Sequence, residues 1–237
     1  MPTCRLCLKE GKLRNSHIVP EFLYEPFYND KGHMMGINGI GSKGWKPLQM
    51  GLREPLFCEG CEQHFNEHFE KPFKAAWVDA SPLPSPWPVD RVVWVKVEYN
   101  SFKLFHLCVL FRASVSSLPT FSVVRLGPHE ERVRKLLLSK DSGHDWQYPV
   151  FGFAVVHHRT NEIVSLISQG ESGRLGGQIC HGMIYGGVFW WVCFGSHPNR
   201  EFLQIALRPD GNLPLGSSPW NEVGAIQAAA KALRRGG

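Results

Sequence analysis

Long apolar runs are absent from the sequence. The longest apolar segments, near residues 104–111 and 188–194, are shorter than the ~18–20 residues of a membrane-spanning helix. We also expect no secretory leader, because the first residues lead straight into polar ones without an apolar stretch. We therefore expect a cytoplasmic protein with no membrane partner.

A strong excess of one charge is missing as well. The 237-residue chain has 26 Lys and Arg against 21 Asp and Glu, which gives a formal net charge of +5. Such an excess permits a polyanionic partner without requiring one, because most surface Lys and Arg are simply solvated. The content of 43% hydrophobic and 20% charged residues indicates a globular protein and excludes a disordered one.

Cysteine is scarce, but four of the seven cysteines form two CxxC pairs: Cys4 with Cys7, and Cys58 with Cys61. In a reducing compartment, paired cysteines indicate metal binding and not a disulfide framework. Two thiolates two residues apart can bind one tetrahedral ion from a single tight turn, so two pairs complete the four-sulfur shell of a structural zinc. The alternative, one redox CxxC motif, does not explain two pairs. The sequence therefore predicts a structural zinc site.

The other three cysteines stand singly, two of them in apolar runs: Cys108, Cys180 and Cys193. We interpret them as small core residues. A Gly-rich stretch at 36–44 lacks the spacing of a phosphate-binding loop and is interpreted as an exposed loop.

A proline-rich segment divides the chain. Prolines at every second position of 82–88 cannot form a helix or a central strand, and they favour an extended spacer. We therefore predict a zinc module over 1–76, a linker over 77–90 and a second domain over 91–237.

Hydrophobic periodicity predicts an α+β fold. In the zinc module, Phe65 and Phe69 are four residues apart and predict a short amphipathic helix over 62–71. In the second domain, helices are expected at 101–114, from Pro128 onward and at 222–235. Strands are expected at 92–98, 121–126, 187–194 and 202–207, with a hairpin formed by 150–158 and 162–167.

A histidine lies between the cysteine pairs. The order is a CxxC pair, then Ser16-His17-Ile18-Val19-Pro20, then the second pair, then a helix that carries Asn66. Over about residues 4–70 this order resembles the HNH (ββα-metal) endonucleases of the treble-clef zinc type. The resemblance implies a small zinc-bound treble-clef ββα module. It also implies that His17 is a general base that activates water, and that Asn66 binds a catalytic Mg²⁺ or Mn²⁺.

One residue departs from the family pattern. The family has an acidic or other metal-binding residue directly before the base histidine, whereas this chain has Ser16, which binds a divalent ion poorly. His64 and His68, four residues apart on the helix, could complete a metal site with His17. The alternatives are that both are exposed helix residues and that His17 is a packed histidine bonded to the backbone.

The sequence therefore predicts a metal-dependent endonuclease that hydrolyses phosphodiester bonds, with residues 91–237 recognising the substrate or a protein partner. DNA is the expected substrate and RNA the alternative. A looser similarity to bacterial proteins found near phage-defence genes implies an antiviral role. Two rival functions remain: a non-catalytic zinc-stabilised nucleic-acid-binding module, which Ser16 favours, and an interaction scaffold.

Overall fold

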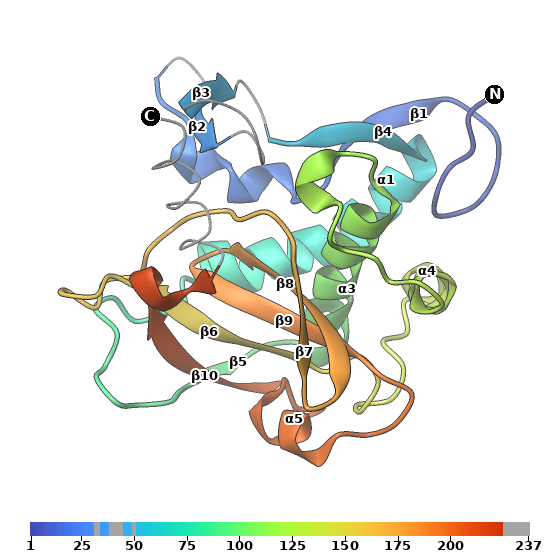
Figure 1. The fold of residues 1–237 in the computed structure, drawn as a ribbon. Coiled ribbons are helices and arrows are strands. Elements are labelled where there is room, and N and C mark those ends of the chain that lie inside the picture. Colours follow the sequence, from blue (N-terminus) through green and yellow to red (C-terminus); the bar gives the residue numbers. More distant parts are fainter. Residues whose placement is uncertain (31–33, 38–44, 49–50, 225–237) are drawn as a thin grey trace.

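An antiparallel hairpin opens the fold. The computed structural model describes residues 1–30, 34–37, 45–48 and 51–224. Strand β1 (Leu13–His17) pairs with β4 (Arg53–Cys58), so that Leu13 lies opposite Cys58. A second hairpin consists of β2 (Met34–Ile37) and β3 (Trp45–Leu48). Figure 1 shows the first hairpin above a larger sheet, with the N-terminus beside it.

A long helical segment follows β4 directly. It begins as α1 (Glu59–Phe65) and continues through wider π-helical turns at 66–70. The short helix α2 (Lys71–Phe73) follows, and further π-helical turns at 74–79 end the segment. Every fourth residue is a buried aromatic: Phe65, Phe69, Phe73 and Trp77. At 3.6 residues per turn, side chains spaced by four drift about 40° per step. The π-helical turns offset this drift and keep the four aromatics on one buried face. The helical segment extends beyond the predicted 62–71.

A six-stranded mixed sheet forms the rest of the fold, and with the helices it confirms the predicted α+β class. Only β10 and β6 run parallel; the other pairs are antiparallel. The strand order is β5 (Val93–Lys96), β10 (Asn212–Pro219), β6 (Val150–Val156), β9 (Val188–Phe194), β8 (Gln178–Tyr185) and β7 (Glu171–Leu175).

Helix α3 (Tyr99–Val115) joins the hairpin to the sheet. Its first turn is capped by Glu98, whose side chain accepts hydrogen bonds from two backbone N–H groups. All residues from 102 to 114 are buried, as predicted for the run at 101–114, because both sides of the helix are covered. Phe105 stacks on Phe73, with ring centroids 3.7 Å apart. Phe102, one turn earlier, contacts Trp190 of β9.

The predicted division into 1–76, 77–90 and 91–237 stays a prediction. In the folded chain, one continuous core contains buried residues from both the first and the third of these ranges. In the proline-rich segment, the side chain of Trp87 is buried. The backbone N–H of Trp87 donates to the carbonyl of Asn161 at 2.7 Å. The proline-rich segment therefore packs against the rest of the fold.

Several predicted elements are confirmed: the strands near 92–98 and 187–194, and a helix after Pro128, which is α4 (His129–Ser139). Two predicted strands are wrong. Residues 121–126 begin at the end of a single 3₁₀ turn (Pro119–Phe121) and lie outside the sheet. Residues 202–207 overlap α5 (Arg200–Ile205), which starts where the Asn199 side chain accepts a hydrogen bond from Glu201 N–H.

The predicted hairpin of 150–158 with 162–167 is confirmed in a short form. The chain turns at 158–160, Val156 bridges Ile163 in antiparallel fashion, and the N–H groups of His157 and Val164 donate to the carbonyls of Glu162 and Val155, both at 2.8 Å. Beyond this short pairing, β6 pairs with β9 and β10. Of the loop predicted at 36–44, residues 36 and 37 lie in β2 instead, and 38–44 lie outside the described residues. Most of the helix predicted at 222–235 also lies outside them. Among the described residues, no helix has the length and apolar character needed to cross a bilayer.

The single cysteines divide into two groups. Cys108 is a buried free thiol in α3, as predicted. Cys180 and Cys193 face each other across β8 and β9, with their Cα atoms 4.0 Å apart, and they form a disulfide. Both are buried, as predicted for small core residues, but the sequence analysis did not predict their bond, because only strand pairing brings them together.

A buried imidazole lies between α3 and the sheet. His106 is fully buried, and the Tyr185 hydroxyl contacts its Nδ1 at 2.5 Å. Its Nε2 has no hydrogen-bond partner in the described part of the chain. Burial lowers the pKa of His106 well below its usual range, so the ring is neutral at pH 7.

This neutral histidine predicts a loss of stability in acid. Below about pH 6.5 the unfolded chain binds a proton at this histidine that the folded chain does not, so stability falls by up to about 1.4 kcal/mol per pH unit. Urea unfolding of His106→Gln between pH 7 and 5 should show a smaller loss than the wild type. The exposed His144→Gln control should match the wild type, and equal slopes in all three proteins would contradict the account.

Candidate metal centre and its neighbours

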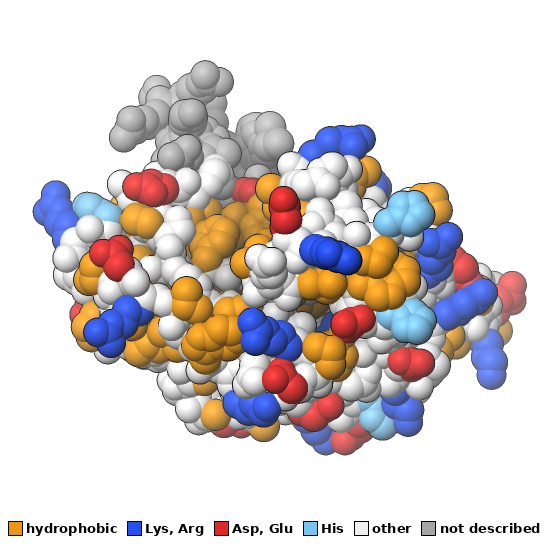
Figure 2. All heavy atoms as spheres, turned by 90° about the horizontal axis from the view of Figure 1, so that it is seen from below, with side chains coloured by type: hydrophobic (Ala, Val, Ile, Leu, Met, Phe, Trp, Pro, Cys, Tyr) orange, Lys and Arg blue, Asp and Glu red, His pale blue; other side chains and the backbone are white. Residues whose placement is uncertain are grey.

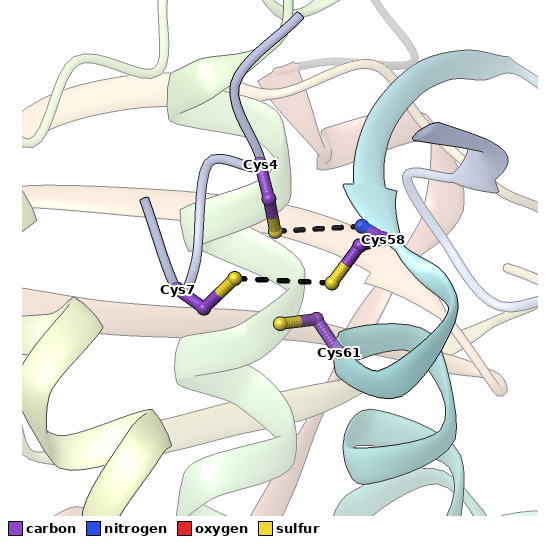
Figure 3. A group of neighbouring side chains, drawn as sticks. All are labelled: Cys4, Cys7, Cys58 and Cys61. Carbon is purple, nitrogen blue, oxygen red and sulfur yellow. Dashed lines mark hydrogen bonds between the residues drawn. The ribbon is translucent and has the colours of Figure 1, made fainter. Parts of the chain in front are cut away.

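Four thiols from three elements converge beside the hairpin (Figure 3). Cys4 and Cys7 lie in the turn before β1, Cys58 ends β4, and Cys61 lies in the first turn of α1. The four sulfur atoms all lie within 4.8 Å of one another, and those of Cys7 and Cys58 are 3.8 Å apart. A tetrahedral zinc ion with ~2.3 Å bonds requires sulfurs about 3.8 Å apart. Sulfurs this close could hold a structural metal such as zinc.

The first cysteine turn has the backbone of a metal knuckle. Leu8 adopts a left-handed conformation, with φ 62°, and its N–H donates to the Cys4 carbonyl at 3.0 Å. The N–H of Cys58 points at the Cys4 sulfur from 3.4 Å. Burial raises the pKa of the Cys4 thiol, but N–H donors that include Cys58 and Cys7 outweigh burial and lower the pKa to about 7. Burial raises the pKa of Cys7 and Cys61, and the neighbouring thiols raise that of Cys61 further. Since thiolates are the metal-binding form, Cys4 is ready to bind zinc, whereas Cys7 and Cys61 would lose their protons on binding it.

His17 ends strand β1 with 21% of its side chain exposed. Its Nε2 lies 2.5 Å from Oε2 of Glu21. The other carboxylate oxygen of Glu21, Oε1, accepts a hydrogen bond from the Tyr28 hydroxyl at 2.5 Å. Burial lowers the pKa of His17; Glu21 opposes this effect, and Arg53 adds to it. The ring is therefore largely neutral at pH 7.

Ser16 is buried, and its hydroxyl donates to the carboxylate of Glu62 in the first turn of α1. Burial raises the pKa of Glu62, and Arg112 and Ser16 only partly offset this effect. A carboxylate from the helix thus lies next to the position where the family pattern has an acidic residue. The sequence reasoning missed Glu62, although its place directly after Cys61 is visible in the sequence.

A buried guanidinium links α3 to this site. Arg112 is 1% exposed, and its Nη2 lies 2.5 Å from Glu70 and 3.8 Å from Glu62. Its Nη1 donates to the backbone carbonyl of His17 at 3.0 Å, and its carbon Cζ lies 4.8 Å from the centre of the Phe65 ring. Arg112 therefore neutralises Glu70 and fixes the end of β1.

His64 and His68 do not join His17 in the predicted site. The Nε2 of His64 lies 2.7 Å from the carbonyl oxygen of Leu137 in α4, and the His68 ring packs against His64. In the described ranges, the four cysteines are the one group of three or more His, Cys, Asp or Glu whose donor atoms come within 4.8 Å of one another. Asn66 is exposed, one turn beyond Glu62.

The face in Figure 2 carries both signs of charge. Lys and Arg side chains alternate there with Asp, Glu and apolar groups, so this face presents no continuous basic surface. In comparisons with family models, curated proteins and solved structures, nothing matches this chain.

The four-sulfur cluster predicts that the protein depends on zinc. Structural zinc supplies ~10–16 kcal/mol of apparent binding energy in small modules, so its removal should unfold the hairpin and lower the melting temperature. Elemental analysis should find one zinc per chain in the wild type and almost none in Cys7→Ser. The matched change outside the cluster, Cys108→Ser, should keep the metal. Equal zinc content in both variants would contradict the assignment.

The buried guanidinium predicts a large loss of stability in Arg112→Leu. The change leaves Glu70 charged and without its partner in a largely buried place, which typically costs about 3–5 kcal/mol. Urea unfolding measures this loss. Because an apolar pair avoids the unpaired charge, the double variant Arg112→Leu, Glu70→Leu should regain part of it. A single variant within about 1 kcal/mol of the wild type would show that the ion pair contributes little.

Proposed function

We propose that this chain is an HNH-like, metal-dependent endonuclease that hydrolyses nucleic-acid phosphodiester bonds. The observation that carries the proposal is the place of His17: it ends the first strand of a hairpin joined to a helix at a four-cysteine cluster, and its ring is partly exposed and largely neutral. A neutral imidazole is the form that accepts a proton from water.

The proposed catalytic ion would be held by oxygen donors. Mg²⁺ in enzymes is often held by one or two carboxylates together with water and substrate phosphate. Glu62, 26% exposed, and the exposed Asn66 lie one helical turn apart and would hold Mg²⁺ or Mn²⁺. When bound, the ion would neutralise charge on the scissile phosphate. These two residues replace the set of His64 and His68, whose contacts are with α4 and with each other.

The chemistry assigned to the chain's own residues is brief. His17 takes a proton from water, the water oxygen bonds to phosphorus, and the bond to the leaving oxygen breaks. The leaving oxygen then takes a proton from solvent. DNA is the proposed substrate and RNA the alternative, with residues 91–237 recognising substrate or a protein partner. A role in bacterial defence against phage rests on the family resemblance alone.

A second candidate is a non-catalytic nucleic-acid-binding module. Arg112 places a positive charge beside Glu62 and Glu70 and thereby reduces their need for a metal, which favours this candidate. A cavity of about 480 Å³ next to the first knuckle is lined by three arginines and two glutamates, among other residues: Arg5, Arg125, Arg134, Glu130 and Glu131. The arginines are the groups that would contact a phosphate backbone there.

A plasmid-nicking assay with Mg²⁺ or Mn²⁺ separates the two candidates. Loss of a general base typically costs 10²–10⁴-fold in rate, so His17→Ala should lose about that much while keeping its zinc. Glu62→Gln should raise the Mg²⁺ concentration needed for half-maximal cleavage, because one ligand loses its charge. The exposed His144→Ala control should cut like the wild type.

Two outcomes would oppose the nuclease proposal. Cleavage that persists in His17→Ala would exclude this histidine as the base. Salt-dependent binding of DNA by a wild type that cuts nothing would favour the non-catalytic module.

A further inference from the structure

We propose that Glu21 and Tyr28 form a relay that orients the imidazole of His17, so that Nδ1 is the nitrogen that receives the proton. Glu21 is then a positioning residue, four places after the base. The catalytic part of this inference rests on the proposed nuclease function, whereas the orientation of the ring does not.

The contact between the imidazole and the carboxylate carries the argument. Glu21 opens a short 3₁₀ turn directly after Pro20, and this turn places its Oε2 2.5 Å from the Nε2 of His17. Both atoms are shielded from solvent, and neither has an aligned hydrogen bond, so the two make a close contact in which the ring N–H does not point straight at Oε2. A nitrogen and an oxygen this close repel each other unless a proton lies between them. Nε2 therefore carries the hydrogen, and Nδ1 has the free lone pair.

Tyr28 fixes the other carboxylate oxygen. Its hydroxyl donates to Oε1 of Glu21 at 2.5 Å, and the N–H of Gly51 donates to the Tyr28 oxygen at 3.2 Å. This direction leaves the tyrosine proton for Glu21 alone. The carboxylate is thus held from one side and offers Oε2 to His17 on the other side.

The surrounding charges suit this role. His17 interacts with two acidic groups, Glu21 and Glu70, and with two basic groups, Arg53 and Arg112. Of these four, Glu21 is the group whose charged atom directly contacts the ring. When Nδ1 accepts a proton from water, the resulting imidazolium is stabilised by the fixed carboxylate, as in other histidine bases paired with an acid.

Nitrogen NMR of the labelled histidine ring tests the orientation without any assay of activity. Above the pKa of His17, the wild type should show a protonated Nε2 and an unprotonated Nδ1. In Glu21→Ala the preference should be lost, so that the two nitrogen shifts move toward each other. Tyr28→Phe should move them in the same direction by less. The exposed Glu25→Ala, one turn along, is the matched control and should keep the wild-type shifts.

Cleavage kinetics test the catalytic part. Glu21→Ala should lower kcat about 10²-fold with KM unchanged, because a misplaced base loses its near-attack geometry. The acid limb of its pH–rate profile should move to lower pH, since the carboxylate that favours the imidazolium is gone.

Failure of the two proposals is distinguishable. A wild-type ring with the proton on Nδ1, or identical ring shifts in Glu21→Ala and wild type, would overturn the relay whatever the activity. A wild type that cuts, with Glu21→Ala equal to it in kcat and pH profile, would also overturn the positioning role while the nuclease stands. A wild type that cuts nothing would contradict the proposed nuclease function, and the NMR result would still decide the orientation of the His17 ring.

Discussion

Convergence of four thiols is the constraint on which the N-terminal half depends. The cluster ties the turn before β1 to the end of β4 and to the first turn of α1, across more than fifty residues of chain. A metal that closes such a loop removes much of the conformational freedom of the unfolded chain. The same closure sets the direction of β1, and therefore where His17 stands relative to the helix.

A buried ion pair is the second interaction that connects the elements around His17. Arg112 reaches from α3 to the end of β1 and to Glu70 on the long helix, so one buried side chain connects three elements. Such a pair contributes little net stability compared with an apolar core, but removal of one partner is costly. The arrangement makes the geometry around His17 depend on α3, which also packs on the sheet. A change in the sheet half of the protein can thus reach the candidate base through packed contacts.

Local signals in the sequence predicted what is encoded locally. The two CxxC pairs, the buried run of α3 and the apolar strand β9 were all predicted, since spacing and periodicity report them directly. Short apolar runs were ambiguous, and 202–207 proved helical because the Asn199 cap was overlooked. Arg112 was out of reach, because its partner Glu70 is 42 residues away and only folding pairs them. The contact between His17 and Glu21 could have been predicted, because the two residues are only four positions apart.

X-ray absorption at the zinc edge tests the central claim most directly. The account predicts a first shell of four sulfur atoms at about 2.3 Å, with no nitrogen or oxygen ligand. A shell that contains imidazole nitrogen would contradict it, as would a purified, folded protein without bound metal. In either case the hairpin and helix would be held by something other than the four thiolates, and the position of His17 would need another explanation.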